Sequence, residues 1–281
     1  MDQVAELGEW IAEGGVVVLS GAGLSTDSGI PDYRGPSGSA RRSTPMTYQT
    51  FTRDPIARRR YWARSHLGWR TIGEARPNDG HRAVARMQQH GLLDGIITQN
   101  VDGLHQAAGA RDVVELHGNL ARITCLDCGD RTPREHMAAR LEAANPDFAA
   151  VASAINPDGD AELDDEQLDG FVTVDCLSCG GMLKPDVVYF GETVPPERVS
   201  RSFALVASAR TLLVLGSSLT VMSGRRFVLR AAKDGIRVAI VNRGVTRGEP
   251  YAGLVIDAPL GIVLPNIVPG LSSVPSGQMA I

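Results

Sequence analysis

Short apolar runs that end in small or polar residues recur along the chain. They occupy residues 16–19, 96–98, 113–116, 212–215 and 238–241. Continuous runs rich in Val, Ile and Leu are typical of strands covered on both faces of a sheet. Apolar residues at helical spacing mark residues 2–13, and helical segments such as 80–90 and 223–234 lie between several of the runs. The pattern therefore predicts strands that alternate with helices.

Such alternation predicts an α/β fold with a doubly wound, parallel, Rossmann-like sheet, because parallel strands need long crossover connections. In sheets of this kind, ligands bind beyond the carboxyl ends of the strands. We therefore expect the polar turns after the strands to meet in one crevice. These turns begin at Ser20, Gln99, His117, Gly216 and Asn242.

Two stretches depart from this pattern. Residues 35–76 are rich in Arg and aromatic side chains, and residues 121–183 hold the cysteines around an acidic, turn-rich middle. We expect both insertions to form one small helical and zinc-binding domain. Residues 1–34, 77–120 and 184–264 then form the large domain. Residues 265–281 are rich in Pro, Gly and Ser and predict a flexible tail.

The composition is that of an ordinary globular protein. Of 281 residues, 43% are hydrophobic and 21% are charged, and the net charge is −4. No stretch is strongly basic, so a nucleic-acid partner is not expected. No apolar run is long enough to span a bilayer, and the N-terminal segment resembles neither a signal peptide nor a transit peptide. We expect a cytoplasmic protein with no membrane partner.

The four cysteines fall into two CxxC pairs, Cys125 with Cys128 and Cys176 with Cys179. Each pair places two thiolates on one tight turn, and two pairs complete a closed tetrahedral zinc site. In a cytoplasmic chain this usage favours a metal over disulfides. A redox CxxC is the alternative, although it would not need two copies. The set predicts one structural zinc ion with no open position for chemistry.

A glycine-rich turn follows the first predicted strand and contains Gly21, Gly23 and Gly29. Glycines at this place let backbone N–H groups approach a pyrophosphate at the start of a helix. The turn departs from the dehydrogenase fingerprint, because no acidic residue closes a second strand at the usual distance. An ordinary strand–helix turn is therefore the alternative to a nucleotide site.

Longer motifs are more specific. They are Gly29-Ile30-Pro31-Asp32-Tyr33-Arg34, residues 98–105, Leu116-His117-Gly118, residues 184–192 and residues 216–219. In this order, with the cysteine pairs between His117 and Lys184, they resemble the sirtuin family over nearly the whole chain up to residue 264. Residues 31–34, 60–64 and 179–186, with the wide separation of the cysteine pairs, resemble class II sirtuins most closely.

The resemblance implies an NAD-dependent enzyme that removes acyl groups, acetyl or longer, from lysine side chains of proteins or peptides. Its products would be nicotinamide, 2′-O-acyl-ADP-ribose and free lysine. The large domain would bind NAD, with Ala22, Gly23 and Ser25 at the diphosphate and Asn242 at the adenine-side ribose. Further residues implied to bind NAD are Gly21, Ile30, Pro31, Asp32, Tyr33, Arg34, Gln99, Asn100, Val101, Asp102, Gly216, Ser217, Ser218, Arg243, Gly244 and Leu260.

By the same resemblance, His117 is the general base that activates a ribose hydroxyl, and Asn100 and Asp102 complete the catalytic set. The ordinary pKa of a histidine, about 6.5, suits this task. A histidine after a strand is otherwise more often structural. His105 is expected to orient its own loop.

The substrate peptide is expected in the cleft between the domains. Strand addition to the peptide backbone is implied for Val187, Val188, Phe190, Gly191 and Glu192. Tyr61 and Arg64 have the Tyr-x-x-Arg spacing by which desuccinylase sirtuins hold an acyl carboxylate, and a solvated helix face is the alternative.

Three other functions fit parts of the pattern. An NAD-dependent dehydrogenase could contain a structural zinc, and a mono-ADP-ribosyltransferase could use the same site. A non-catalytic reader of acyl-lysine would bind peptide and leave NAD intact. His117, Asn100 and Asp102 argue against the reader, because a reader needs no nicotinamide pocket.

Overall fold

The computed structural model describes residues 3–33, 45–150, 152, 154–156, 158–163, 168 and 170–267. The larger of two parts of the structure is built around a six-stranded parallel sheet in the order β3-β2-β1-β7-β8-β9. The chain leaves the central strand β1 first in one direction and then in the other, which is the doubly wound arrangement. The predicted fold class is confirmed. The strands are β1 (Val16–Ser20), β2 (Leu93–Thr98), β3 (Val114–Glu115), β7 (Thr211–Leu215), β8 (Arg237–Asn242) and β9 (Leu254–Asp257).

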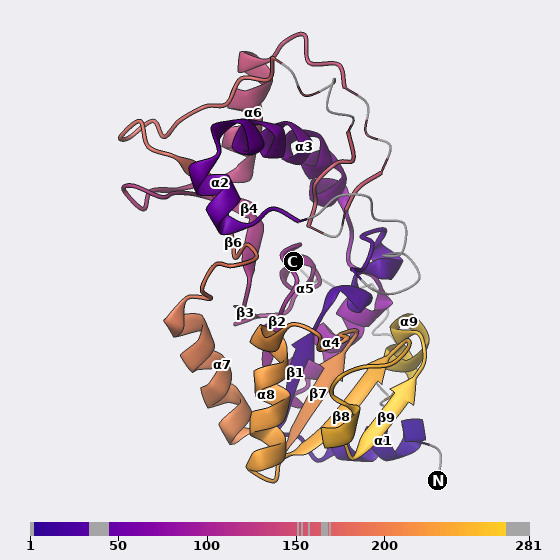
Figure 1. Ribbon diagram of the computed structural model, residues 1–281. Coiled ribbons are helices and arrows are strands. Elements are labelled where there is room, and N and C mark those ends of the chain that lie inside the picture. Colours follow the sequence, from indigo (N-terminus) through magenta and orange to yellow (C-terminus); the bar gives the residue numbers. More distant parts are fainter. Residues whose placement is uncertain are drawn as a thin grey trace, which may run out of the picture.

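Helices cover both faces of this sheet, as the apolar runs require. Along β1, Val16 and Val18 pack into one helical layer, whereas Val17 and Leu19 pack into the other. The first layer contains α1 (Gln3–Ala12), α4 (Asp79–Gln89) and α9 (Leu260–Val263). The second layer contains α7 (Pro196–Ser208) and α8 (Met222–Lys233), which lie side by side in Figure 1.

The smaller part lies beyond the carboxyl ends of the large sheet (Figure 1). Its core joins the two insertions, because Phe51 and Trp62 of the first pack in one cluster with Ile123 and Leu141 of the second. Three antiparallel strands lie beside its helices in the order β5-β4-β6. The elements are α2 (Tyr48–Arg53), α3 (Pro55–Glu74), β4 (Gly118–Cys125), β5 (Arg131–Pro133), α6 (Arg134–Ala144) and β6 (Leu183–Val187).

The two longer strands of the small sheet cross the boundaries predicted at residues 120 and 184. Gly118, at the start of β4, pairs with Val187, at the end of β6. The predicted division into domains stays a prediction. Within the predicted tail, residues 265 and 266 belong to a short 3-10 helix (Leu264–Asn266), and the side chain of Ile267, which follows it, is buried. Residues 268–281 lie outside the described residues.

An ion-pair network ties the small sheet to the large part. The guanidinium of Arg122 on β4 contacts the carboxylates of Glu115 on β3 and Asp186 on β6, at 2.5 and 3.1 Å. Asp186 also accepts from Arg198 of α7 at 3.0 Å. The network therefore links β3 and α7 of the large part to β4 and β6 of the small sheet. Among the helices that the structure describes, none is long and apolar enough to cross a membrane.

Candidate active site

A cavity of about 1050 Å³ lies between the carboxyl ends of the large sheet and the smaller part. The turns after β1, β2, β7 and β8 all contribute to its lining, as the strand pattern predicts. The predicted NAD-binding residues that line it are Gly21, Ala22, Gly23, Ser25, Ile30, Asp32, Tyr33, Gln99, Asn100, Val101, Asp102, Gly216, Ser217, Ser218, Asn242, Arg243 and Gly244. Among the described residues, Pro31 and Leu260 are absent from the lining. Arg34 lies outside the described part of the chain.

The glycines of the first turn are needed because this turn is pressed against the turn after β7. A Cβ atom at Gly23 would lie 2.9 Å from Cα of Gly216, and one at Gly21 would lie 2.8 Å from the Gly216 carbonyl oxygen. Gly216 itself has a φ of 61°, in the left-handed region that favours glycine. The two turns thus meet between β1 and β7, where the strand order reverses and doubly wound sheets bind dinucleotides.

Hydrogen bonds join the turns after β1 and β2. Ser25 Oγ donates to Asp102 Oδ2 at 2.7 Å, and the other carboxylate oxygen accepts the Leu104 N–H at 2.9 Å. Asn100 Nδ2 donates to Ser25 Oγ and to the Gly21 carbonyl, each at 3.1 Å. Burial raises the pKa of Asp102, and the hydrogen bonds from Leu104 and Ser25 oppose that rise. The Asn100 and Asp102 side chains are therefore fixed at the cavity wall.

His117 follows β3, and its side chain lines the same cavity. Its Nδ1 lies 2.9 Å from the carbonyl oxygen of Gln99, which can only accept, so Nδ1 carries the proton and Nε2 carries the lone pair. Burial lowers the pKa of His117, and the cations Arg198 and Arg226 lower it further, while the bond to Gln99 raises it. The ring is therefore a neutral base at neutral pH.

Two further histidines, which are buried, form hydrogen bonds next to these turns. His105 Nε2 lies 2.8 Å from Ser20 Oγ, and His81 Nδ1 lies 3.0 Å from Asn78 Oδ1. Their rings meet edge to face with centroids 5.2 Å apart. Burial lowers the pKa of His105 to about 3 and that of His81 to about 4. Neither side chain lines the cavity, so both are placed to hold the turns in position.

The segment expected to bind substrate runs along the cavity between His117 and α2. The Val188 N–H donates to the His117 carbonyl at 2.8 Å, and the Phe190 carbonyl accepts the Tyr48 N–H at 2.9 Å. The Phe190 side chain is 42% exposed. The lining residues of this segment include all those predicted: Val187, Val188, Phe190, Gly191 and Glu192.

Tyr61 and Arg64 differ in their relation to the cavity. Tyr61 is buried and lines it, whereas Arg64 is absent from the lining among the described residues. The Arg64 carbonyl accepts the Ala161 N–H at 3.1 Å. Asp158 and Asp160, from the segment between the cysteine pairs, are also among the lining residues. Burial raises the pKa of Asp160 well above its ordinary value, and the charge of Asp158 raises it further.

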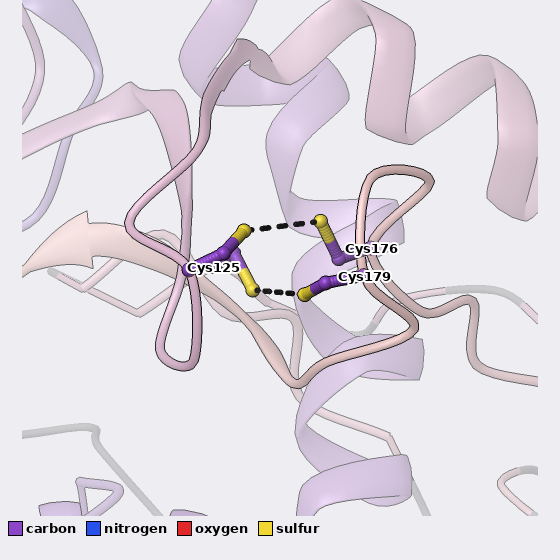
Figure 2. A group of neighbouring side chains, drawn as sticks. Cys125, Cys176 and Cys179 are labelled. Atoms are coloured by element: carbon purple, nitrogen blue, oxygen red, sulfur yellow. Dashed lines mark hydrogen bonds between the residues drawn. The ribbon is translucent and has the colours of Figure 1, made fainter.

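The four cysteines form a compact cluster away from the cavity. Their Sγ atoms all lie within 4.8 Å of one another. Cys125 and Cys179 sulfurs are 3.6 Å apart, and those of Cys128 and Cys176 are 3.8 Å apart (Figure 2). Four thiolates at about 2.3 Å from one tetrahedral zinc ion would lie roughly 3.8 Å from each other. The arrangement fits a closed zinc site, and none of the four cysteines lines the cavity.

Sequence reasoning missed several lining residues. Ser223 and Arg226 reach the cavity from the first turns of α8, and Asp158 and Asp160 reach it from the segment between the cysteine pairs. The position of Ser223 at a helix start, shortly after the strand-end turn at residues 216–219, was the available signal. For the two aspartates, the acidic segment has no periodicity that indicates where it packs.

Known proteins similar to this chain belong to one family. The model of the Sir2 family matches residues 21–223. NAD-dependent protein deacetylase 1 of Streptomyces coelicolor A3(2) is 62% identical over 264 residues, covering 94% of this chain and 88% of that protein. NAD-dependent protein deacetylase 1 of Mycobacterium avium strain 104 is 50% identical over 266 residues, covering 93% of each.

The solved structures similar to this chain include Sir2 enzymes. One described as "Structural Basis for the Mechanism and Regulation of Sir2 Enzymes" has a TM-score of 0.75 and 30% identity, covering 95% of this chain and 96% of that one. A complex described as "Sir2-p53 peptide-NAD+" has a TM-score of 0.75 and 29% identity, covering 92% and 94%. The chain therefore belongs to the Sir2 family.

Proposed function

We propose that this chain uses NAD to remove acyl groups, acetyl or longer, from lysine side chains of proteins, with His117 as the general base. One observation carries this proposal. The imidazole of His117 lies in the same cavity as the glycine turns and as residues 187–192. A neutral base between a dinucleotide cradle and a peptide-binding segment suits acyl transfer. Relatives 62% and 50% identical to the chain are named NAD-dependent protein deacetylases.

The residues present fit NAD. The cavity volume of about 1050 Å³ is at the upper limit of ordinary small-ligand pockets, about 300–1,000 Å³, which suits an extended dinucleotide together with an acyl-lysine side chain. Its walls offer hydroxyl and amide groups from four strand-end turns. When bound, NAD supplies an electrophilic sugar carbon, from which nicotinamide departs, and the ribose hydroxyl that receives the acyl group.

The chain's own residues then have separate tasks. Ala22, Gly23 and Ser25 bind the diphosphate, and Asn242 binds the adenine-side ribose. The nicotinamide pocket consists of Ile30, Asp32, Gln99, Asn100 and Asp102. His117 is the base that ends with the proton of the ribose hydroxyl on Nε2, while its Nδ1–H stays bound to the Gln99 carbonyl. A positioned base of this kind contributes about 100- to 10,000-fold in rate.

Finer assignments follow as further proposals. The four cysteines hold one structural zinc ion, and the two insertions form one small domain beside an NAD-binding domain. The wide separation of the cysteine pairs supports a place in class II. The use of all four cysteines for a metal, with none in a disulfide, is consistent with a cytoplasmic location. Tyr61 contacts the acyl chain. Arg64 is not among the described residues that line the cavity, so its position does not support a role in binding an acyl carboxylate.

The test is to incubate the purified chain with NAD and an acetyl-lysine peptide and to identify products by mass spectrometry. We expect nicotinamide, free lysine peptide and 2′-O-acetyl-ADP-ribose. His117→Ala lowers the rate at least about 100-fold and keeps the circular dichroism of the parent. His136→Ala, at an exposed histidine of α6, is the matched control and keeps full activity.

Other products would contradict the proposal. Reduced nicotinamide would indicate a dehydrogenase. Transfer of label from NAD to protein without acyl-peptide would indicate an ADP-ribosyltransferase. Peptide binding with NAD left intact would indicate a reader. Full activity of His117→Ala would overturn only the assignment of His117 as the base and would leave the proposed reaction in place.

A further inference from the structure

The hydroxyl group of Ser223 lies against the reactive nitrogen of His117. Ser223 Oγ is 2.8 Å from His117 Nε2, and both side chains line the cavity. Ser223 stands in the first turn of α8. The cap residue of this helix, Val221, makes no side-chain capping bond, and the Ser223 hydroxyl is directed at the histidine.

The start of α8 is held in register with the loop that orients His117. A Cβ atom at Gly224 would collide with Oε1 of Gln99, so the helix is in close contact with that residue. The carbonyl of Gln99 is the acceptor for His117 Nδ1. The imidazole is therefore held at both nitrogens, by Gln99 on one side and by Ser223 on the other.

This arrangement decides how a proton reaches the base. A neutral imidazole with its proton on Nδ1 has one lone pair in the ring plane, at Nε2. The Ser223 O–H donates into that lone pair, so a substrate hydroxyl cannot donate to Nε2 while Ser223 is in place. Ser223 Oγ has acceptor lone pairs of its own and faces the cavity. A substrate hydroxyl can donate to it.

We propose that Ser223 relays the proton from the ribose hydroxyl to His117. Ser223 Oγ gains the proton of the hydroxyl as that O–H bond breaks, and it gives its own proton to Nε2. Ser223 ends neutral, His117 ends protonated, and the ribose oxygen keeps the electron pair that attacks the acyl carbon. The relay rests on the proposed function, because it needs His117 as the base.

The charges around His117 explain why a hydroxyl at Nε2 matters. The ring is near Arg198 of α7 and Arg226 of α8, and the bond at Nδ1 is to an uncharged carbonyl of the turn after β2. Once Nε2 is protonated, Ser223 Oγ accepts from it. Hydrogen bonds with one charged partner are roughly twice as strong as neutral ones. Ser223 therefore favours the protonated imidazole, which the two cations oppose.

The first test uses the protein without NAD. The pKa of His117 is measured by NMR titration of the imidazole in the parent chain, Ser223→Ala and Ser223→Thr, with His117→Ala to assign the signals. Loss of the charge-assisted bond lowers the pKa by about half a unit to one unit in Ser223→Ala. Ser223→Thr keeps the hydroxyl and the parent value. An unchanged pKa in Ser223→Ala would overturn the relay.

The second test is kinetic. Ser223→Ala lowers kcat about 10- to 100-fold, with the KM for peptide changed by less than roughly two-fold. Ser223→Thr restores most of kcat, and Ser208→Ala, at an exposed serine of α7, is the control. If Ser223→Ala has the parent kcat and His117→Ala is inactive, the relay is refuted and His117 remains the base. An active His117→Ala would refute the base itself.

Discussion

His117 donates its Nδ1–H to the backbone carbonyl of Gln99 across 2.9 Å. The base is thus oriented by a main-chain group at the end of β2 and not by a carboxylate. An uncharged acceptor stabilises an imidazolium less than a carboxylate does. With burial and the charges of Arg198 and Arg226, this leaves the pKa of His117 below its ordinary value.

The lowered pKa sets the expected pH dependence of activity. The base works only when it is neutral, and a lowered pKa keeps it neutral to lower pH. The acid limb of kcat/KM should therefore have its midpoint below about 6.5, the ordinary histidine value. Initial rates of nicotinamide release between pH 5 and 8 measure it. A midpoint above the ordinary value would contradict this account of the site.

Asp102 offers a second test, because its carboxylate accepts from both Ser25 and Leu104. Asp102→Asn keeps the shape of the side chain but replaces one acceptor oxygen by a donor. We expect nicotinamide release to fall about 100-fold, the usual loss when one preorganised polar group of an active site is removed. Asp94→Asn, at an exposed position of β2, should leave the rate unchanged. A parent rate for Asp102→Asn would place Asp102 outside the catalytic set.

Zinc removal should abolish activity without any zinc chemistry in the reaction. The strand β4 runs from Gly118, next to His117, to Cys125 in the cysteine cluster. Disordering the cluster therefore disturbs the segment that carries the base. We expect about one zinc per chain by elemental analysis, and Cys128→Ser should lose both metal and activity. Full activity of a metal-free chain would show that the cluster does not support the site.

His81 and His105 predict loss of stability in acid. Their pKa values are lowered to about 4 and about 3, so the folded state leaves both neutral at pH values where the unfolded chain protonates them. The unfolded state then binds more protons, and the free energy of unfolding falls as pH drops below about 6.5. Each histidine contributes a slope of up to about 1.4 kcal/mol per pH unit.

Urea unfolding at pH 7, 6 and 5 measures this slope. His105→Asn should reduce the slope by up to about 1.4 kcal/mol per pH unit, although it lowers the stability at pH 7 by removing the bond to Ser20. The exposed His90 is the matched control, and His90→Asn should leave the slope unchanged. A parent slope in His105→Asn would show that other groups cause the acid sensitivity.

The sheet could be predicted from the sequence because its central strands are buried on both faces. In β1, helices cover all four residues of the apolar run 16–19, two on each face of the sheet. A continuous apolar run of this kind indicates a buried strand. The edge strand β9 and the small-sheet strands β4, β5 and β6 could not be predicted in this way. Buried residues are mixed with half-buried or exposed ones in β4 and β9, β5 has no buried residue, and the pairing of β4 with β6 shifts register between Asn119 and Ile123.

Within the site, strand-end turns could be predicted but long-range neighbours could not. The topology brings turns after parallel strands to one edge, which places His117 and Gly23 in the same cavity. The contact of Ser223 with His117 joins residues 106 positions apart and depends on how α8 packs. Helical spacing put Arg64 one turn from Tyr61, but spacing alone does not say which face of α3 borders the cavity.

The cavity lining predicts which acyl groups are accepted. The pKa of Asp160 reports on the surroundings that an acyl carboxylate would meet beside Tyr61. Burial and the charge of Asp158 raise its pKa and outweigh the cations Arg134 and Arg64, which lower it, so these surroundings disfavour a negative charge. We therefore expect acetyl-lysine and lipoyl-lysine peptides to react faster than succinyl-lysine peptide. Asp158→Asn should raise the relative rate on the succinyl peptide several-fold, since the repelling charge is removed, and Arg64→Ala should leave the order of the three peptides unchanged. A succinyl preference that Arg64→Ala abolishes would show instead that Arg64 binds the acyl carboxylate.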